Sequence, residues 1–128
     1  VTDRTQAEAA LRDGERRFRA SFEQAAVGMA MGGLDGRIAR ANARLLDLLG
    51  YAAADPPTSF QAIVHPADLP GLLERIAQLA ADEIDRFSQQ KRFLRRDGTL
   101  LWAQATLSVV RDDAGRPASV VAVLEDVT

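Results

Sequence analysis

The chain has 128 residues, which is enough for one domain with its own hydrophobic core. Apolar residues make up 47% and charged residues 27%, as in soluble globular proteins, and the net charge of −2 provides no overall field that would attract nucleic acid or an anionic membrane. The absence of cysteine excludes disulfides, thiolate metal sites, thiol nucleophiles and cofactors attached through sulfur. No apolar stretch approaches the roughly 20 residues that span a bilayer. We therefore expect a cytoplasmic domain without direct membrane contact, although a larger parent protein could be anchored in a membrane.

Residues 4 to about 25 are predicted to form an amphipathic helix. Its apolar positions recur at helical spacing and form one stripe among charged residues. Two interpretations stay open: the stripe packs against the domain's own sheet, or it forms the seam of a homodimer. The residues assigned to this dimer helix are Leu11, Phe18 and Phe22.

The next segment predicts a strand over 27–31, an Asp-Gly turn at Asp35 and Gly36, and a second strand from Ile38. Asn42 suits the N-cap of a short leucine-rich helix over 43–49, which Gly50 ends. A longer helix is predicted to begin at Asp68. Its apolar face comprises Leu69, Leu72, Leu73, Ile76, Leu79, Ala80 and Ile84.

Three further strands are predicted over 89–95, 100–110 and 118–125, joined by turns rich in Asp, Gly and Pro. In the middle strand, alternation places Ala103, Ala105, Leu107 and Val109 on one face and Trp102, Gln104, Thr106 and Ser108 on the other. Helices placed between a group of two strands and a group of three indicate an α+β fold. The simplest arrangement is one five-stranded antiparallel sheet with the helices on one face.

Small and polar residues on these elements define a candidate ligand pocket between the helices and the sheet. Alternation allows only one of Gln89 and Gln90 to point inward, with Arg92 on the side of Gln90. The alternative, which we favour, is that Leu73, Ile76 and Leu79 fill this space and it is simply core. The candidate pocket residues are Met29, Met31, Leu73, Ile76, Gln90, Arg92, Ala103 and Ala105.

Little in the sequence indicates catalysis. One histidine, no cysteine and carboxylates on exposed helix faces offer no nucleophile, base or metal site. The glycines at 28, 32, 33 and 36 lie in a hairpin and lack the G-x-G-x-x-G spacing of a phosphate loop. We expect neither catalytic nor metal-binding residues, so this domain is not predicted to be an enzyme.

Several short motifs occur in a characteristic order between about Glu15 and Thr128. Together they make the chain resemble a PAS domain of the sensory-box type, including its C-terminal PAC portion. The motifs are Glu15-Arg16-Arg17-Phe18-Arg19, Asp35-Gly36-Arg37-Ile38 with Asn42, Leu48-Leu49-Gly50-Tyr51, His65-Pro66-Ala67-Asp68-Leu69, Arg95-Arg96-Asp97-Gly98-Thr99 with Trp102, Asp113-Ala114-Gly115-Arg116-Pro117 and Asp126-Val127-Thr128.

The resemblance implies a sheet of strand order 2-1-5-4-3 that encloses a small pocket with the helices. It also implies residues 1–25 as a linker or dimerisation helix and 26–128 as the PAS sensor domain. Such domains commonly occur in tandem before histidine kinases, diguanylate cyclases or chemotaxis receptors, and Val127-Thr128 repeats Val1-Thr2 as in one unit of a series. The closing residues Asp126, Val127 and Thr128 would then form the junction that passes the signal on.

The resemblance also bears on cofactors. Light-sensing relatives form a flavin adduct through cysteine, and another relative attaches a cinnamoyl group through cysteine, so neither chemistry is expected here. Haem-binding relatives supply a histidine from the long helix, whereas His65 lies before it and is assigned a structural role at the turn. No cofactor is predicted, and non-covalent flavin or another small ligand stays open.

The expected function is a sensor module that relays a signal to an effector domain of the same chain. The alternative is a ligand-free spacer that dimerises within a tandem array. A homodimer is expected in either case.

Overall fold

A computed structural model describes residues 16–127 of the chain. Residues 16–24 are helical, which confirms the predicted N-terminal helix over that range, whereas Leu11 lies outside the described residues. The remaining elements are β1 (Gly28–Gly32), β2 (Ile38–Ala41), α2 (Ala43–Leu49), α3 (Phe60–Ile63), α4 (Leu69–Ala80), β3 (Arg86–Leu94), β4 (Leu100–Arg111) and β5 (Pro117–Asp126).

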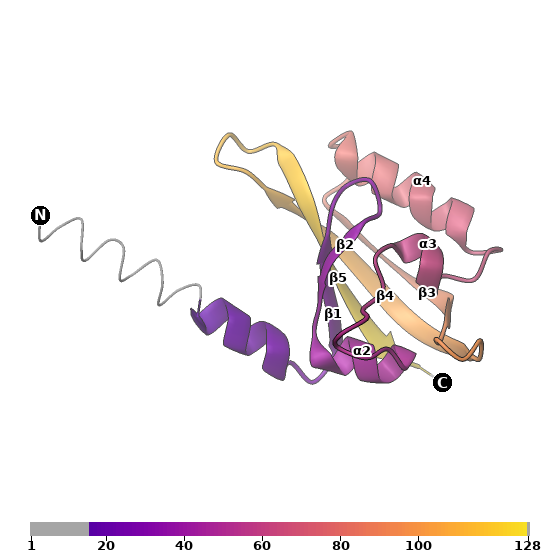
Figure 1. Cartoon of the computed structure of the whole chain (residues 1–128). Coiled ribbons are helices and arrows are strands. Elements are labelled where there is room, and N and C mark those ends of the chain that lie inside the picture. The colour runs from indigo at the N-terminus through magenta and orange to yellow at the C-terminus, as the bar shows by residue number, and fades with distance from the viewer. Residues whose placement is uncertain (1–15, 128) are drawn as a thin grey trace, which may run out of the picture.

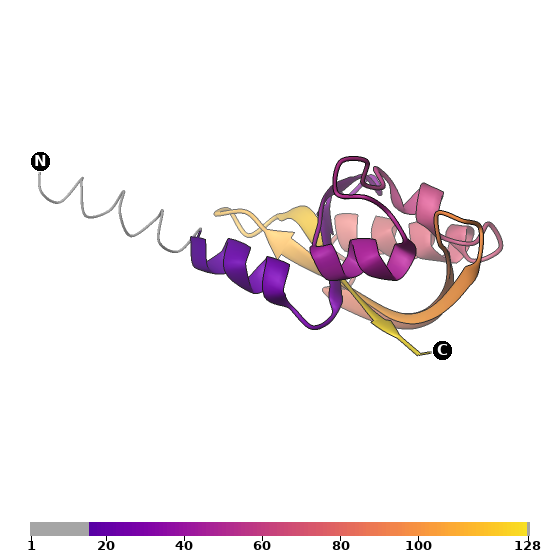
Figure 2. The ribbon, with the colours of Figure 1, turned by 60° about the horizontal axis from the view of Figure 1, so that its bottom comes forward.

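The strands form one antiparallel sheet in the order β2-β1-β5-β4-β3, which confirms the predicted fold class and topology. The first and last strands of the chain therefore pair at the centre of the sheet, with Ala30 opposite Ala122. Helices α2, α3 and α4 lie on one side of this sheet, while the N-terminal helix extends away from the domain beside β1 (Figures 1 and 2).

The core lies between the sheet and these helices. Strands β1, β3, β4 and β5 alternate between buried and partly exposed residues, as expected when one face of a sheet is covered. Each fully buried leucine on the helices contributes roughly 1.5–3 kcal/mol through the hydrophobic effect. The largest fully buried side chains are Phe60, Phe93, Leu45, Leu49, Ile63, Leu72, Leu79, Leu101, Leu107, Leu124, Val64 and Val120.

The ends of α2 agree with the sequence. The Asn42 side chain caps its first turn by accepting a hydrogen bond from Leu45 N at 2.9 Å. Gly50 ends it in the left-handed conformation, with φ of 77°, which favours glycine because it lacks Cβ.

One predicted cap and two predicted boundaries need correction. Asp68 precedes α4 as predicted, but its side chain does not cap the helix, because Arg92 binds its carboxylate. The helix ends at Ala80, so Ile84 lies outside it, beyond Asp82, which has a positive φ of 61°. Strand β3 begins at Arg86, three residues before the predicted start, because its pairing with β4 extends to Ser108. Within residues 16–127 no helix is long and apolar enough to cross a membrane.

Candidate functional site

Strand β3 places two polar side chains on the covered face of the sheet. Residues alternate along the strand, so Gln89 and Lys91 share the inner face with the buried Phe87 and Phe93. Lys91 is only 7% exposed, and burial lowers the pKa of its ammonium; the smaller effect of Asp68 opposes this shift. Two inward polar groups in an otherwise apolar layer make this region the first candidate site.

In the described part of the chain, the Gln89 oxygen has no hydrogen-bond partner and Lys91 forms no salt bridge, although Asp68 attracts its ammonium. The Oε1 atom of Gln89 is buried and accepts no hydrogen bond. No salt bridge to Lys91 forms within residues 16–127. The Lys91 ammonium lies beside α4, 3.8 Å from the position that a Cβ of Gly71 would occupy.

The structure does not bring the eight candidate pocket residues together. Met29 and Met31 lie on the outer face of the sheet, because Gly28, Ala30 and Gly32 of β1 face the core. On the strand at the other edge, Gln90 and Arg92 also lie on the outer-face register, opposite Gln104 and Trp102. Four of the eight therefore lie at the inner side: Ile76, Ala103 and Ala105 in the core and the half-buried Leu73 on α4.

Asp68 and Arg92 fasten the beginning of α4 to β3. The guanidinium donates from Nε to Asp68 Oδ2 at 3.0 Å and from Nη2 to Asp68 Oδ1 at 2.9 Å, while the backbone N–H of Arg92 also donates to Oδ2 at 2.9 Å. These bonds lower the pKa of the Asp68 carboxyl to about 2, against the opposing effect of partial burial. His65 stabilises the preceding turn, because its Nδ1 accepts a hydrogen bond from Ala67 N at 3.1 Å.

Asn42 joins the N-terminal helix to the sheet. Its side chain is fully buried and makes four hydrogen bonds. Oδ1 accepts from Met29 N and Leu45 N, both at 2.9 Å, and Nδ2 donates to Phe22 O at 2.8 Å and to Val27 O at 3.1 Å. One amide thereby links the end of the N-terminal helix, β1 and the first turn of α2.

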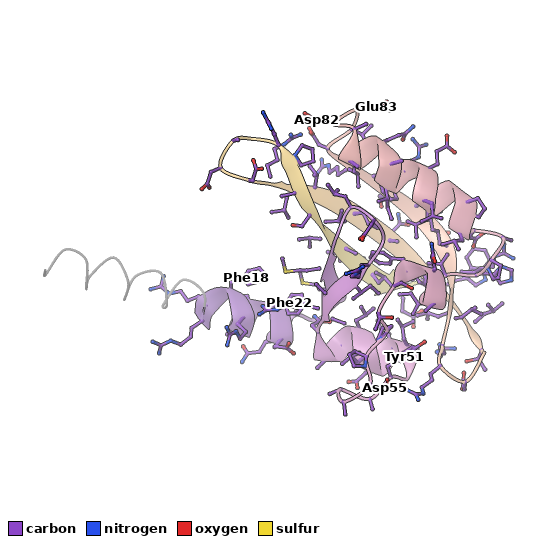
Figure 3. The ribbon with its side chains drawn as sticks, turned by 45° about the horizontal axis from the view of Figure 1, so that its top comes forward. Phe18, Phe22, Tyr51, Asp55, Asp82 and Glu83 are labelled. Carbon is purple, nitrogen blue, oxygen red and sulfur yellow. The ribbon has the colours of Figure 1, made fainter. Side chains whose placement is uncertain are left out.

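Phe18 and Phe22 lie differently although they occupy one helix face. Phe22 is 3% exposed and packs within the chain, while Phe18 is 44% exposed one turn further from the sheet (Figure 3). Their rings stack with centroids 6.0 Å apart. Of the two described residues assigned to a dimer seam, Phe18 is therefore the one that remains available to a partner chain.

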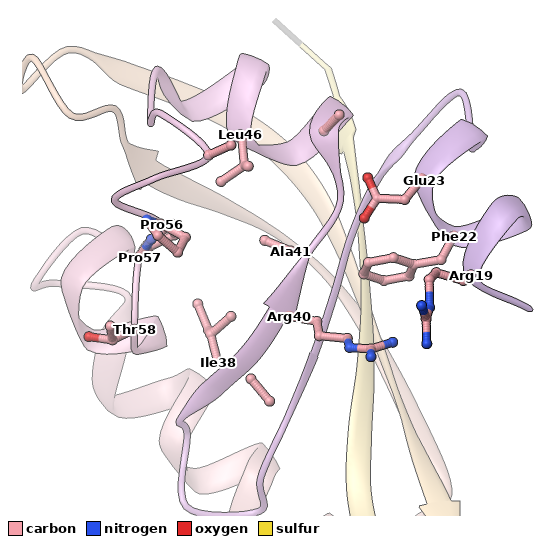
Figure 4. A pocket seen from close by; sticks show the side chains of 13 residues that line it. Arg19, Phe22, Glu23, Ile38, Arg40, Ala41, Leu46, Pro56, Pro57 and Thr58 are labelled. Carbon is pink, nitrogen blue, oxygen red and sulfur yellow. The ribbon is translucent and has the colours of Figure 1, made fainter. Parts of the chain in front are cut away.

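A hollow of about 700 Å³ separates the N-terminal helix from the edge strand β2 and the loop before α3. Figure 4 shows the Phe22 ring directed from the helix toward Ala41 and Arg40 on β2. No pattern in the sequence indicated this hollow. Its lining consists of Arg19, Phe22, Glu23, Ile38, Ala39, Arg40, Ala41, Ala43, Leu46, Ala53, Pro56, Pro57 and Thr58.

The other end of the domain follows directly from the central strands. β5 ends at Asp126, opposite Ala103 of β4, and Val127 N donates to Trp102 O at 3.0 Å. These contacts keep the predicted output junction on the sheet up to Val127. Thr128 lies outside the described residues.

Besides the hollow, two features of the site were not predicted from the sequence: the inward position of Gln89 and Lys91, and the long-range hydrogen bonds of Asn42. Phe87 lies two residues before Gln89 and Phe93 four residues after it, so the alternation along β3 could have placed Gln89 and Lys91 on the inner face with them. Asn42 was assigned as a cap alone, because its other partners lie 13–20 residues away in the chain. Within residues 16–127 no three side chains of His, Asp or Glu gather as a metal site.

Comparison with known proteins agrees with this geometry. The family model described as PAS fold matches residues 38–124. The chain is 33% identical over 118 residues to the probable diguanylate cyclase DgcE of Escherichia coli, covering 91% of this chain and 11% of that protein. It is 25% identical over 124 residues to the sensor histidine kinase TmoS of Ectopseudomonas mendocina, covering 96% and 13%. The chain thus spans about a tenth of the length of these relatives.

The fold also matches a solved structure. The PAS domain of a protein from Colwellia psychrerythraea superposes with a TM-score of 0.79 at 15% sequence identity, over 88% of this chain and 96% of that one. One conclusion follows from the order of the strands, the helices on the inner face of the sheet and the family match over most of the chain. This chain belongs to the PAS fold family, which occurs in sensor kinases and diguanylate cyclases.

Proposed function

We propose that this PAS domain is a relay module of a larger signalling protein, which couples its N-terminal helix to the segment that follows β5. The observation that carries this proposal is the Asn42 junction. Asn42 binds the last turn of the helix through Phe22 O and the start of β1 through Met29 N. Because β1 pairs with β5 along its whole length, a displacement of the helix has a short hydrogen-bonded path to Asp126.

The relatives support the setting of this relay. The matching proteins named as a diguanylate cyclase and a sensor histidine kinase are both far longer than this chain. We therefore propose that an effector of one of these two classes, and neighbouring PAS domains, belong to the same polypeptide. The cytoplasmic location stays a prediction of the sequence.

Shortening Phe22 tests the relay. Phe22→Leu keeps the apolar character but loosens the helix against β2, at an expected cost of about 1 kcal/mol. Hydrogen exchange should then become faster in β5 over residues 120–126 than the overall loss of stability explains. The matched control is Phe93→Leu, which loosens an equally buried ring at the opposite edge of the sheet. Equal exchange of β5 in the two variants would refute the relay.

A second candidate function is a ligand-free dimerisation module. Two observations favour it: Leu72, Ile76 and Leu79 are buried in the core, and Phe18 is exposed on the N-terminal helix. An exposed aromatic ring on an amphipathic helix is the type of residue that anchors protein–protein contacts.

The dimer proposal predicts that Phe18→Glu converts the protein from dimer to monomer without unfolding it. The substitution places a charge at a partly exposed position and removes the stacking on Phe22, so the loss of stability should stay near about 1 kcal/mol. Sedimentation velocity at tens of micromolar measures the change, and circular dichroism checks the fold. A wild-type protein that sediments as a monomer at that concentration would contradict the proposal.

Absorption and native mass spectra of the purified protein distinguish the sensor from the spacer. A co-purified small molecule, including flavin with its absorption near about 450 nm, would support sensing. A colourless protein of the unliganded mass would support the spacer.

A further inference from the structure

The two methionines of the chain lie close together on the outer face of the sheet. Met29 and Met31 occupy alternate positions of β1, and both side chains are half-buried, whereas the residues between and beside them face the core. The chain has no cysteine, so these two thioethers contain its only sulfur atoms. A thioether that solvent reaches is open to oxidation by peroxides.

The neighbouring strands give the two methionines different surroundings. On the β5 side both lie opposite valines. On the β2 side, Met31 lies opposite Arg40. The backbone of Met29 instead meets Asn42, whose Oδ1 accepts from Met29 N and whose N–H donates to Met29 O, both at 2.9 Å. In this register Met31 has a cation opposite it and Met29 does not.

Arg40 is placed to bind a new group on Met31. Its side chain is exposed, and within residues 16–127 it forms no ion pair. Figure 4 shows it leaving β2 toward Arg19 and Phe22 of the N-terminal helix, at the side of the hollow. Directly opposed residues of an antiparallel pair have Cβ atoms about 4.5–5.5 Å apart, a separation that a guanidinium spans easily.

We propose that Met31 is a site of reversible oxidation to methionine sulfoxide, and that Arg40 donates a hydrogen bond to the sulfoxide oxygen. The oxidant is hydrogen peroxide. The sulfur lone pair attacks one peroxide oxygen, the S–O bond forms as the O–O bond breaks, and the proton of the transferred oxygen passes to the departing hydroxide to give water. Sulfur loses two electrons and the peroxide gains them. A dithiol reductase reverses the change, with a disulfide and water as the other products.

Arg40 favours this product in two ways. Its N–H donors stabilise the negative charge that develops on the departing hydroxide, and afterwards they bind the sulfoxide oxygen, which accepts hydrogen bonds far better than a thioether sulfur. A sulfoxide on Met29 would lie beside a valine with no cation opposite it. The register of β1 and β2 therefore makes Met31 the preferred site.

Oxidation would change the surroundings of the N-terminal helix. A hydrogen bond to the Met31 sulfoxide draws the Arg40 guanidinium from Arg19 and Phe22 toward the sheet, which alters one wall of the hollow. This inference goes beyond the relay and does not depend on it, because oxidation is followed at the methionines themselves, whether or not β5 responds to the helix.

The test is to treat the 128-residue protein with hydrogen peroxide and to follow each methionine by peptide mapping, as a mass gain of about 16 Da. In the folded protein Met31 should oxidise at least about threefold faster than Met29, whereas in concentrated urea the two should react equally fast. The NMR signal of the Arg40 Nε–H should shift on oxidation and return after treatment with methionine sulfoxide reductases.

Arg40→Ala is the decisive variant. It removes the donor and also uncovers Met31, so Met31 should slow to the rate of Met29, whereas an arginine that only shields the sulfur would give faster oxidation when removed. The matched control is Arg44→Ala on α2, which removes another exposed arginine without an ion pair in the described part of the chain. It should leave the ratio of the two rates unchanged.

Four results would overturn the proposal. One is that Met29 and Met31 oxidise equally fast in the folded protein, and another is that Met31 reacts faster in Arg40→Ala than in the wild type. The third is that Arg44→Ala changes the ratio as much as Arg40→Ala, which would indicate a general effect of surface charge. The fourth is an Arg40 signal that does not move when Met31 is oxidised. None of these results touches the relay, which Phe22→Leu tests separately.

Discussion

Asn42→Ala should lower the free energy of unfolding by about 3 kcal/mol or more, because the four groups bound by its side chain lose their partner in a buried place. The loss of the cap on α2 alone would account for only about 1 kcal/mol. Urea unfolding followed by circular dichroism measures the total. Hydrogen exchange should also show the helix at residues 16–24 losing protection first, since Asn42 holds its end.

The matched control for Asn42 is Asp35→Ala. Asp35 also accepts a hydrogen bond from a backbone N–H, that of Arg37 at 3.1 Å, but its side chain is exposed. Water replaces the lost partner there, so the cost should stay below about 1 kcal/mol. A loss at Asn42 as small as the loss at Asp35 would show that the junction is not rigid and would weaken the relay proposal.

Gly32→Ala should destabilise the domain by about 3 kcal/mol, because the added methyl group has no room. A Cβ at this position would lie 2.0 Å from the carbonyl oxygen of Arg37, which belongs to the backbone of the β1–β2 turn. The same oxygen accepts the hydrogen bond from Gly33 N at 2.9 Å. The turn and its hydrogen bonding must therefore move before alanine can be accommodated.

Gly33→Ala provides the control for this prediction. Its Cβ would meet Asp35 Oδ1 at 2.6 Å, and an exposed side chain can rotate away at little cost. Urea unfolding should show a loss below about 1 kcal/mol. Similar losses in the two alanine variants would mean that the β1–β2 turn is softer than its geometry suggests.

The sheet and its turns were predictable from the sequence because local rules determine them. Asp-Gly pairs predicted the tight turns, with Gly36 and Gly98 both at positive φ. Asn42 and Gly50 predicted both ends of α2. The alternation along β4 predicted which residues face the core. The strand order, by contrast, came from the family resemblance and not from these patterns.

Four of the eight candidate pocket residues do not lie on the inner face, and on β1 the hydrophobicity of a residue does not indicate which side chains face the core. The larger apolar residues of β1, Met29 and Met31, face outward, while the inner face carries Gly28, Ala30 and Gly32. Packing explains this choice: a Cβ on Gly28 would lie 3.2 Å from the backbone of Leu45 in α2. The close approach of a helix selects small residues, and that approach is a tertiary feature that no local pattern reveals. The same holds for Asn42, whose partners come from three separate segments.

Lys91 is the only lysine of the chain, and it lies inside the fold. Every other basic side chain except His65 is an arginine, whose guanidinium keeps its proton across the physiological pH range. Enzymes that acetylate or ubiquitinate lysine side chains therefore find almost no accessible amine on the folded domain. Its positive surface charges are permanent, so lysine modification elsewhere in a larger protein would leave them unchanged.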